Sequence, residues 1–207
     1  MEATKPFSRR RLILPAVLVV ISIILVMISF SRQMSPEERA LREQIVTIAE
    51  QYLGCNEADG SHRKIIDLYN SQDTLPRGYA VTYEDSWCAT FVSAVAMESA
   101  MADYIPRECS CQQMIALFDV SGGEWVESDW YIPQKGDFIF YAWGEFPLGE
   151  CTGWSDHVGI VEGVYGPFIR VIEGNKDDAV AYRWIWIGHP EIRGYGLPDY
   201  HKAAACS

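Results

Sequence analysis

The chain has 207 residues, enough for one ordinary domain, and a formal net charge of −11 at pH 7. Residues 1–35 carry five of the 17 Lys and Arg residues and one of the 28 Asp and Glu residues, so residues 36–207 hold 12 basic and 27 acidic side chains, a net charge of −15. We therefore expect no nucleic-acid partner, because affinity for nucleic acids comes largely from cationic side chains that neutralise phosphates.

The first predicted element is a transmembrane helix over residues 12–30. This run is uncharged and about as long as a helix must be to cross the hydrocarbon core of a bilayer. Three consecutive arginines precede it and only Arg32 follows closely, so the positive-inside rule places residues 1–11 in the cytoplasm and the rest of the chain outside the cell. We expect residues 31–44 to form a juxtamembrane linker and the start of a helix.

A signal peptide is the alternative interpretation of the same run. Ser29 and Ser31 form a weak small-x-small cleavage site, and cleavage there would leave a secreted domain. The run is longer than the roughly 7–15 apolar residues of a typical cleavable signal. We therefore favour an uncleaved anchor and a single-pass membrane protein with an extracellular domain.

Helix signals open the exported region. Ser35, Pro36 and Glu38 form a capping box with a proline at the first helical position, and apolar residues then recur at helical spacing. These features predict a helix over residues 35–54. Residues 62–72 are a candidate for a second helix.

A third helix is predicted over residues 87–100, "WCATFVSAVAMESA", where apolar residues recur every three or four positions. Cys88 lies in its first turn, where unpaired N–H groups and the positive end of the helix dipole favour a thiolate over a thiol. The alternative is that Cys88 is only a small buried hydrophobic residue beside Trp87. We expect Asp85 to cap this helix rather than to take part in chemistry.

The pattern of residues in the second half of the exported region predicts consecutive antiparallel strands. Runs of β-branched and aromatic residues alternate there with Gly, Pro and Asp, which is typical of strands joined by turns. The predicted strands are residues 136–143, 157–165, 168–175 and 182–188.

The register of the middle hairpin decides which side chains meet, because side chains alternate between the faces of a strand. A three-residue loop, 165–167, places His157 opposite Asn175 and Gly159 opposite Glu173. His157, Glu173 and Asn175 then share one face. A two-residue loop would put His157 on the opposite face from both partners, so we predict the three-residue loop.

The remaining cysteines and acidic residues indicate no metal site. The six cysteines are too few for a disulfide-built scaffold, and no CxxC pair supports a zinc site. The acidic loop 174–179 lacks the pattern of a calcium loop, so we predict neither a metal ion nor a cofactor. In an oxidising compartment we expect disulfides among some of Cys55, Cys109, Cys111, Cys151 and Cys206, with Cys88 left free.

A cysteine at a helix start, a histidine on a strand and a carboxylate or amide that orients the histidine can together perform covalent acyl transfer. The sequence supplies this set in Cys88, His157 and either Glu173 or Asn175. The residues alone leave open which of the last two orients the histidine.

Four motifs, "SWCATFVSAVA", "PQKGDFIFY", "DHVGIVEGV" and "VIEGN", together resemble the CHAP family of cysteine, histidine-dependent amidohydrolases and peptidases. The resemblance spans roughly residues 45–195 and leaves 196–207 as a C-terminal tail. It implies an α+β, papain-like fold in which N-terminal helices, with the nucleophile at a helix start, pack on a C-terminal antiparallel sheet. It also assigns the nucleophile, the base, the orienting carboxylate and a supporting amide to Cys88, His157, Glu173 and Asn175.

One part of the papain-like site has no assignment. Such enzymes commonly take an oxyanion donor from a glutamine just upstream of the cysteine, and this chain has none there. The backbone N–H of Cys88 supplies one donor, and Ser86 or Tyr83 is a candidate for the second.

The resemblance implies a cysteine hydrolase that cuts amide bonds in bacterial peptidoglycan, and the apolar run 12–30 makes the expected enzyme membrane-anchored and extracellular, acting through an acyl-enzyme. Its partners would be peptidoglycan and the membrane. Trp154, in a polar loop beside the histidine, is the best placed of several tryptophans to stack on a sugar ring. The alternative function is a non-catalytic domain that binds the cell wall or serves as a scaffold.

Overall fold

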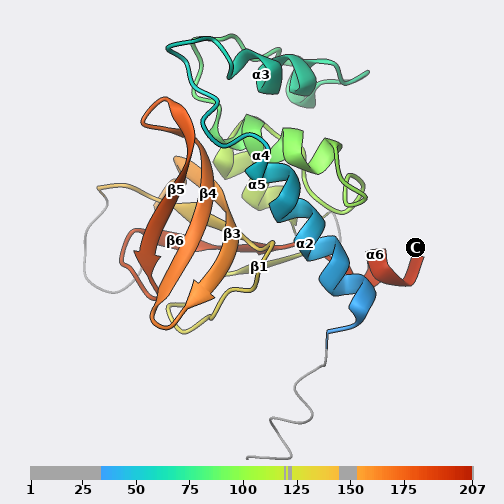
Figure 1. Cartoon of the computed structure of the whole chain (residues 1–207), viewed down its shortest axis with the longest axis vertical. Helices are drawn as coiled ribbons and strands as arrows, with labels where there is room; N and C mark the ends of the chain where they lie inside the picture. The colour runs from blue at the N-terminus through green and yellow to red at the C-terminus, as the bar shows by residue number, and fades with distance from the viewer. Residues whose placement is uncertain (1–33, 119, 121–122, 145–152, 207) are drawn as a thin grey trace, which may run out of the picture. The chain divides into compact units, whose positions relative to one another are not determined.

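The chain divides into two compact units, residues 1–35 and 36–207. The computed structural model describes residues 34–118, 120, 123–144 and 153–206, which make up most of the second unit (Figure 1). The predicted cytoplasmic segment, the membrane helix predicted over 12–30 and Cys151 lie outside the described residues. Within the described part of the chain, no helix is long and apolar enough to span a membrane.

Helices dominate the first half of the second unit. The three predicted helices are confirmed, with tighter bounds, because the chain leaves helical geometry after Glu50 and Asn70. Two short helices near Cys111 and at the C-terminus were not predicted. The helices are α2 (Pro36–Glu50), α3 (Arg63–Asn70), α4 (Cys88–Met97), α5 (Cys111–Phe118) and α6 (Tyr200–Cys206), with a 3-10 turn at Pro76–Gly78.

The strands form a 6-stranded antiparallel sheet in the order β1-β6-β2-β3-β4-β5 (Figure 1). The four predicted strands are present, and β1 and β6 were not predicted. The strands are β1 (Glu124–Val126), β2 (Phe138–Tyr141), β3 (His157–Tyr165), β4 (Phe168–Lys176), β5 (Ala179–Trp186) and β6 (Ile192–Leu197).

The combination of helices with an antiparallel sheet confirms the α+β class and is consistent with a papain-like fold. Strand β6 pairs with both β1 and β2 inside the sheet, and it crosses position 195, where we expected the domain to end. Helices α2 and α6 contact each other. Of the two segments expected to flank the domain, residues 36–44 contribute to α2, and residues 196–206 contribute to β6 and α6, within the same compact unit.

The predicted three-residue loop between β3 and β4 is wrong. Tyr165 pairs with Phe168, so the loop contains only Gly166 and Pro167. Gly166 has φ +61°, a conformation that glycine adopts without strain and that tight two-residue hairpin turns require.

A bulge nevertheless produces the predicted pairing. The register of β3 against β4 shifts between Val161 and Gly163, and beyond this shift Gly159 pairs with Glu173. The extra residue at the bulge moves the rest of β3 by one position relative to β4. This shift compensates for a loop that is one residue shorter than predicted. His157 therefore shares a face with Glu173, as the sequence predicted, although for a different reason.

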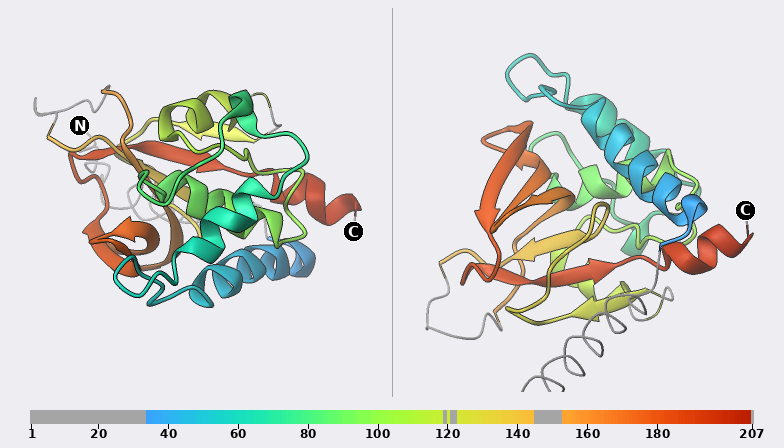
Figure 2. Two further views of the ribbon diagram at one scale, coloured as in Figure 1. Left: turned by 90° about the horizontal axis from the view of Figure 1, so that it is seen from above. Right: turned by 60° about the horizontal axis from the view of Figure 1, so that its bottom comes forward.

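The two faces of the sheet pack differently. One face carries Val158, Ile160 and Ile172 into a core shared with the helices. The other face forms a second cluster from residues of β2 to β6, including Tyr141 and Val171, to which no helix contributes. The sheet is curved (Figure 2), and the buried side chains of this second face pack on one another.

Helix α4 is the centre of the helical layer. It contacts α2, α3, α5, β3 and β4, and its residues from Cys88 to Ala96 are all buried. A helix that is buried all round needs an apolar sequence without a polar stripe, which "CATFVSAVAM" provides.

Gly174 lets α4 approach β4 closely. A Cβ atom built at this position would lie 2.4 Å from the Cβ of Phe91, and real Cβ atoms do not come so near. Phe91 is fully buried and packs edge-on against Tyr52, with ring centroids 6.0 Å apart, so it has no room to retreat. Glycine at 174 therefore sets the distance between the helix that carries Cys88 and the strand that carries Glu173.

We predict that Gly174→Ala lowers the free energy of unfolding by about 1–3 kcal/mol, because the added methyl group overpacks the contact with Phe91. At the size of this unit that corresponds to a melting temperature lower by roughly 2–12 °C, measurable by calorimetry or circular dichroism. Gly163→Ala in the neighbouring strand is the control. Its nearest new contact is the half-exposed ring of Tyr165 at 3.1 Å, which can move aside. Equal melting temperatures for the two variants would contradict the prediction.

Candidate active site

Cys88 is the first residue of α4, as the sequence predicted. The preceding residue, Trp87, is fully buried, and its indole N–H donates a hydrogen bond to the Glu57 carboxylate at 2.9 Å. No side chain caps this end of the helix. The first N–H groups of α4 are therefore available to stabilise negative charge at or near the Cys88 sulfur.

Asp85 does not cap α4, contrary to our expectation. Its Oδ2 accepts hydrogen bonds from the backbone N–H and the hydroxyl of Thr82 at 2.7 and 2.9 Å, and from the hydroxyl of Tyr79 at 2.8 Å. The carboxylate is thus used in the turn that leads to the helix, three residues before its start.

His157, the first residue of β3, lies beside Glu173 on β4. Its Nε2 is 3.1 Å from Oε2 of Glu173, a carboxylate with no exposed surface. The Nε of Arg183 on β5 donates to both oxygens of the same carboxylate, at 2.7 and 2.8 Å. With Nε2 occupied by Glu173, the other ring nitrogen of His157 is left for Cys88.

Asn175 is not an orienting partner of His157. The register of β4 breaks after Glu173, and Asn175 adopts a left-handed backbone with φ +54°, so the alternation of faces ends before it. Its amide donates instead to Glu57 at 3.0 Å, the carboxylate that also accepts from Trp87. Through Glu57, the Asn175 amide is thus linked to Trp87 at the start of α4 and not to the histidine.

The side chains around Cys88 and His157 favour a charged pair. Hydrogen bonding from Cys111 lowers the pKa of the Cys88 thiol well below its usual value; burial opposes the shift, while His157 and the Ala89 N–H add to it. Burial also opposes charge on His157, but Cys88 and Glu173 outweigh it and raise the pKa of His157 to about 9. Between these two pKa values the site holds a thiolate and an imidazolium.

Aromatic rings cover the histidine. Trp143 stacks on Tyr141 with ring centroids 4.6 Å apart, and its ring lies 6.0 Å from that of His157. The guanidinium of Arg183 sits 4.8 Å from the centre of the Trp143 ring. These contacts limit the rotation of His157 and keep water away from its contact with Glu173.

The two candidates for a second oxyanion donor differ in their surroundings. The hydroxyl of Tyr83 donates to Asp67 at 2.7 Å, so it is engaged elsewhere. Ser86 is exposed and lines a pocket of about 260 Å³ together with Tyr79, Asp85 and other residues. Ser86 remains the better candidate.

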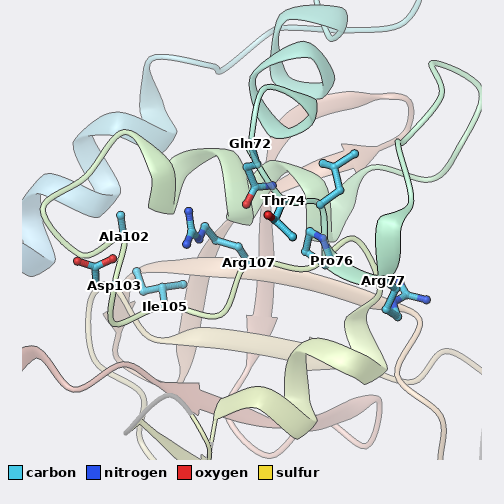
Figure 3. Close-up of a pocket in the computed structure, with 9 residues that line it drawn as sticks. Gln72, Thr74, Pro76, Arg77, Ala102, Asp103, Ile105 and Arg107 are labelled. Atoms are coloured by element: carbon cyan, nitrogen blue, oxygen red, sulfur yellow. The ribbon is translucent and has the colours of Figure 1, made fainter.

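A larger pocket of about 450 Å³ is lined by residues of two loops and holds none of the predicted site residues (Figure 3). Trp154, proposed as a surface for sugar stacking, is 67% exposed in the loop before His157. Pocket size alone thus does not identify the site in this chain, whereas the contacts around Cys88 do.

The expected disulfides are absent among the described cysteines. Cys55, Cys88, Cys109, Cys111 and Cys206 are all free thiols. Cys111 instead lies against Cys88, with the two sulfur atoms 3.6 Å apart.

Sequence reasoning missed Arg183, Glu57 and Cys111. Arg183 is the only cation in the aromatic run 182–188. A charged side chain in such a run needs an oppositely charged partner if it faces the protein interior, so Arg183 could have been identified as a member of a buried ion pair. Glu57 and Cys111 gave no signal, because their partners are 30 and 23 residues away in the sequence and belong to no shared motif.

One of three comparisons with known proteins finds a match. Residues 78–175 match the family model described as the CHAP domain, a range that contains Cys88, His157, Glu173 and Asn175. No curated protein and no solved structure matches the chain.

We predict that Glu173→Gln lowers the pKa of His157 from about 9, because it removes the carboxylate that helps to raise it, and that Asn175→Ala leaves that pKa nearly unchanged. Titration of the His157 ring protons by NMR measures both variants. Amide spectra that match the wild type control for the fold. A larger shift in Asn175→Ala than in Glu173→Gln would reverse the assignment of the orienting residue.

Proposed function

We propose that the protein is a cysteine-dependent hydrolase that cleaves an amide bond in bacterial peptidoglycan, because residues 78–175 match the family model of the CHAP domain. The observation that carries this proposal is the convergence of Cys88, His157 and Glu173 from α4, β3 and β4. Glu173 contacts Nε2 of His157 at 3.1 Å, and both Cys88 and Glu173 raise the pKa of the histidine. The bond cut is either the one between muramic acid and the stem peptide or one within the peptide or cross-bridge.

In the proposed reaction the thiolate of Cys88 attacks the amide carbonyl carbon. The backbone N–H of Cys88 stabilises the negative oxygen that forms, and the imidazolium of His157 gives its proton to the leaving amine. A thioester then joins the acyl group to Cys88. Water, deprotonated by the now neutral His157, attacks this acyl-enzyme and releases the carboxylic acid.

Glu173 and Arg183 support these proton transfers without touching the substrate. Glu173 fixes the ring of His157 and stabilises its charged form. Arg183 holds Glu173 from the other side with hydrogen bonds to both oxygens. The histidine therefore returns to the same position after each proton transfer.

A non-catalytic domain that binds the wall or serves as a scaffold is the second candidate function. Such a domain would have no need for a thiolate beside a buried histidine and carboxylate, and burying these groups costs stability. The intact set of three polar groups therefore favours the enzyme.

We further propose that the domain is anchored in the cell membrane and faces the wall. This proposal rests on the uncharged run 12–30 and on the arginines that precede it. Secretion after signal cleavage is the alternative, and it would leave the same domain outside the cell.

We predict that Cys88→Ala abolishes release of peptide fragments from purified cell walls, with turnover lower by at least about 10⁴-fold, because no nucleophile remains. Mass spectrometry of the soluble products gives both the activity and the bond, since amide cleavage creates a new amine and no new reducing sugar end. Cys109→Ser is the matched control and retains activity. Wild-type release by a folded Cys88→Ala protein would exclude a cysteine mechanism, and wall binding without products in the wild type would favour the scaffold.

Protease added outside intact cells is expected to digest the domain and leave a small fragment that fractionates with the membrane. The physical reason is that only residues near 12–30 would be shielded by the bilayer. Immunoblotting with tags at each end reads the result, and a cytoplasmic protein that survives shows that the cells stayed intact. Full protection of the domain would reverse the proposed orientation, and loss of the N-terminal tag from the mature protein would indicate cleavage.

A further inference from the structure

Cys88 and Cys111 form a close pair of thiols. Their sulfur atoms lie 3.6 Å apart, in van der Waals contact, although 23 residues separate them in the sequence. Both are free and nearly buried, with exposed fractions of 5% and 6%. The fold thus brings a second thiol to the sulfur that we propose as the nucleophile.

The pair has a common structural origin. Cys88 is the first residue of α4 and Cys111 is the first residue of α5, so two helix N-termini converge on the two sulfur atoms. Both helix dipoles favour negative charge at this point. Acyl transfer needs only one nucleophile, so the proposed hydrolysis uses Cys111 at most as a hydrogen-bond donor to Cys88 and gives the Cys111 sulfur no reaction of its own.

The two thiols differ in protonation. The thiolate of Cys88 raises the pKa of Cys111 well above its usual value, and burial acts in the same direction. The pKa of Cys88 moves the opposite way. Near neutral pH the pair therefore holds one proton, with the Cys111 S–H donating to the Cys88 thiolate. In this state the Cys88 thiolate can react with an electrophile, and the Cys111 thiol can then attack the modified Cys88 sulfur.

We propose that Cys88 and Cys111 form a redox-active dithiol site, in which a hydroperoxide oxidises Cys88 and Cys111 then closes a reversible disulfide with it. The site rests on the geometry of the two thiols and does not require the hydrolase function. If that function holds, the disulfide removes the nucleophile and switches the enzyme off.

The chemistry balances in two steps. The thiolate of Cys88 attacks one oxygen of hydrogen peroxide and the O–O bond breaks. The His157 imidazolium gives its proton to the leaving hydroxide, so the products are a sulfenic acid at Cys88, one water molecule and a neutral His157. The sulfur of Cys111 then attacks the sulfur of the sulfenic acid. An S–S bond forms, and the hydroxyl group leaves as water with the proton of Cys111. An external dithiol restores both thiols and is itself oxidised to a disulfide.

Closure needs only a small movement. The sulfur atoms must approach from 3.6 Å to about 2.05 Å, the length of a disulfide bond. The chain before α5, from Tyr104 to Ser110, contains neither helix nor strand, so the start of α5 can shift without breaking a regular element. Glu108 is held by Arg77 and Ser93. Its carboxylate accepts from the backbone N–H groups of Cys109 and Ser110, so the movement is confined to the residues that follow it.

The test treats the full-length protein with a stoichiometric amount of hydrogen peroxide, alkylates the remaining thiols and digests the protein without reductant. Mass spectrometry is expected to find a Cys88–Cys111 linked peptide in the wild type and in Cys109→Ser, whose missing thiol lies two residues from Cys111. The linked peptide is expected to be absent from Cys111→Ser and Cys111→Ala. Persistence of both free thiols, or oxidation of Cys88 without the linked peptide, would overturn the proposal.

A second readout concerns reversibility. After excess peroxide, dithiothreitol should restore alkylation of Cys88 in the wild type. In Cys111→Ser, Cys88 should instead proceed to sulfinic and sulfonic acids, which dithiothreitol does not reduce. Equal recovery in the two proteins would contradict a resolving role for Cys111. Because neither readout uses a wall substrate, the outcome is independent of whether the protein hydrolyses peptidoglycan.

Discussion

The carboxylate of Glu173 has no exposed surface, and an ionised group in such a place is tolerated only when charged partners compensate it. Arg183 bonds both of its oxygens and His157 contacts one of them. Because Arg183 bonds both oxygens independently of the histidine, His157 can lose its proton without leaving Glu173 unpaired. The histidine is thereby free to cycle between its two protonation states, which acid–base catalysis requires, while its position stays fixed.

Three consecutive residues of β4 connect this buried charge to the start of α4. Glu173 contacts His157, Gly174 makes room for Phe91, and Asn175 bonds Glu57, which in turn holds the indole of Trp87 beside Cys88. Each residue of the "EGN" motif therefore helps to fix the position of the nucleophile relative to the base. An amide at position 175 has a physical role even though it does not touch the histidine.

The helix at Cys88 and the strands of His157 and Glu173 could be predicted, because local periodicity and a hairpin of limited length determine them. The shared face of His157 and Glu173 was predicted correctly, but from a loop of the wrong length. The bulge that produces this shared face cannot be recognised from the alternation of residue types in one strand, because it is defined by the pairing with the neighbouring strand. Strand β6 was missed because two glycines interrupt "IRGYGL" and its partners are distant in sequence. The pairing of Cys111 with Cys88 depends on the same long-range packing.

The prediction of disulfides among the cysteines other than Cys88 was wrong, among the described residues, for a related reason. An oxidising compartment favours disulfides in general. A particular disulfide, however, forms only where the fold brings two sulfur atoms close together. In this fold Cys111 is in reach of Cys88, which the sequence interpretation set apart as the thiol that should stay free. The converging helix ends that favour a thiolate for attack on an amide also favour its attack on peroxide, since both reactions use the same lone pair on sulfur. A donor thiol in contact with that thiolate stabilises the reactive form and limits the damage when it is oxidised.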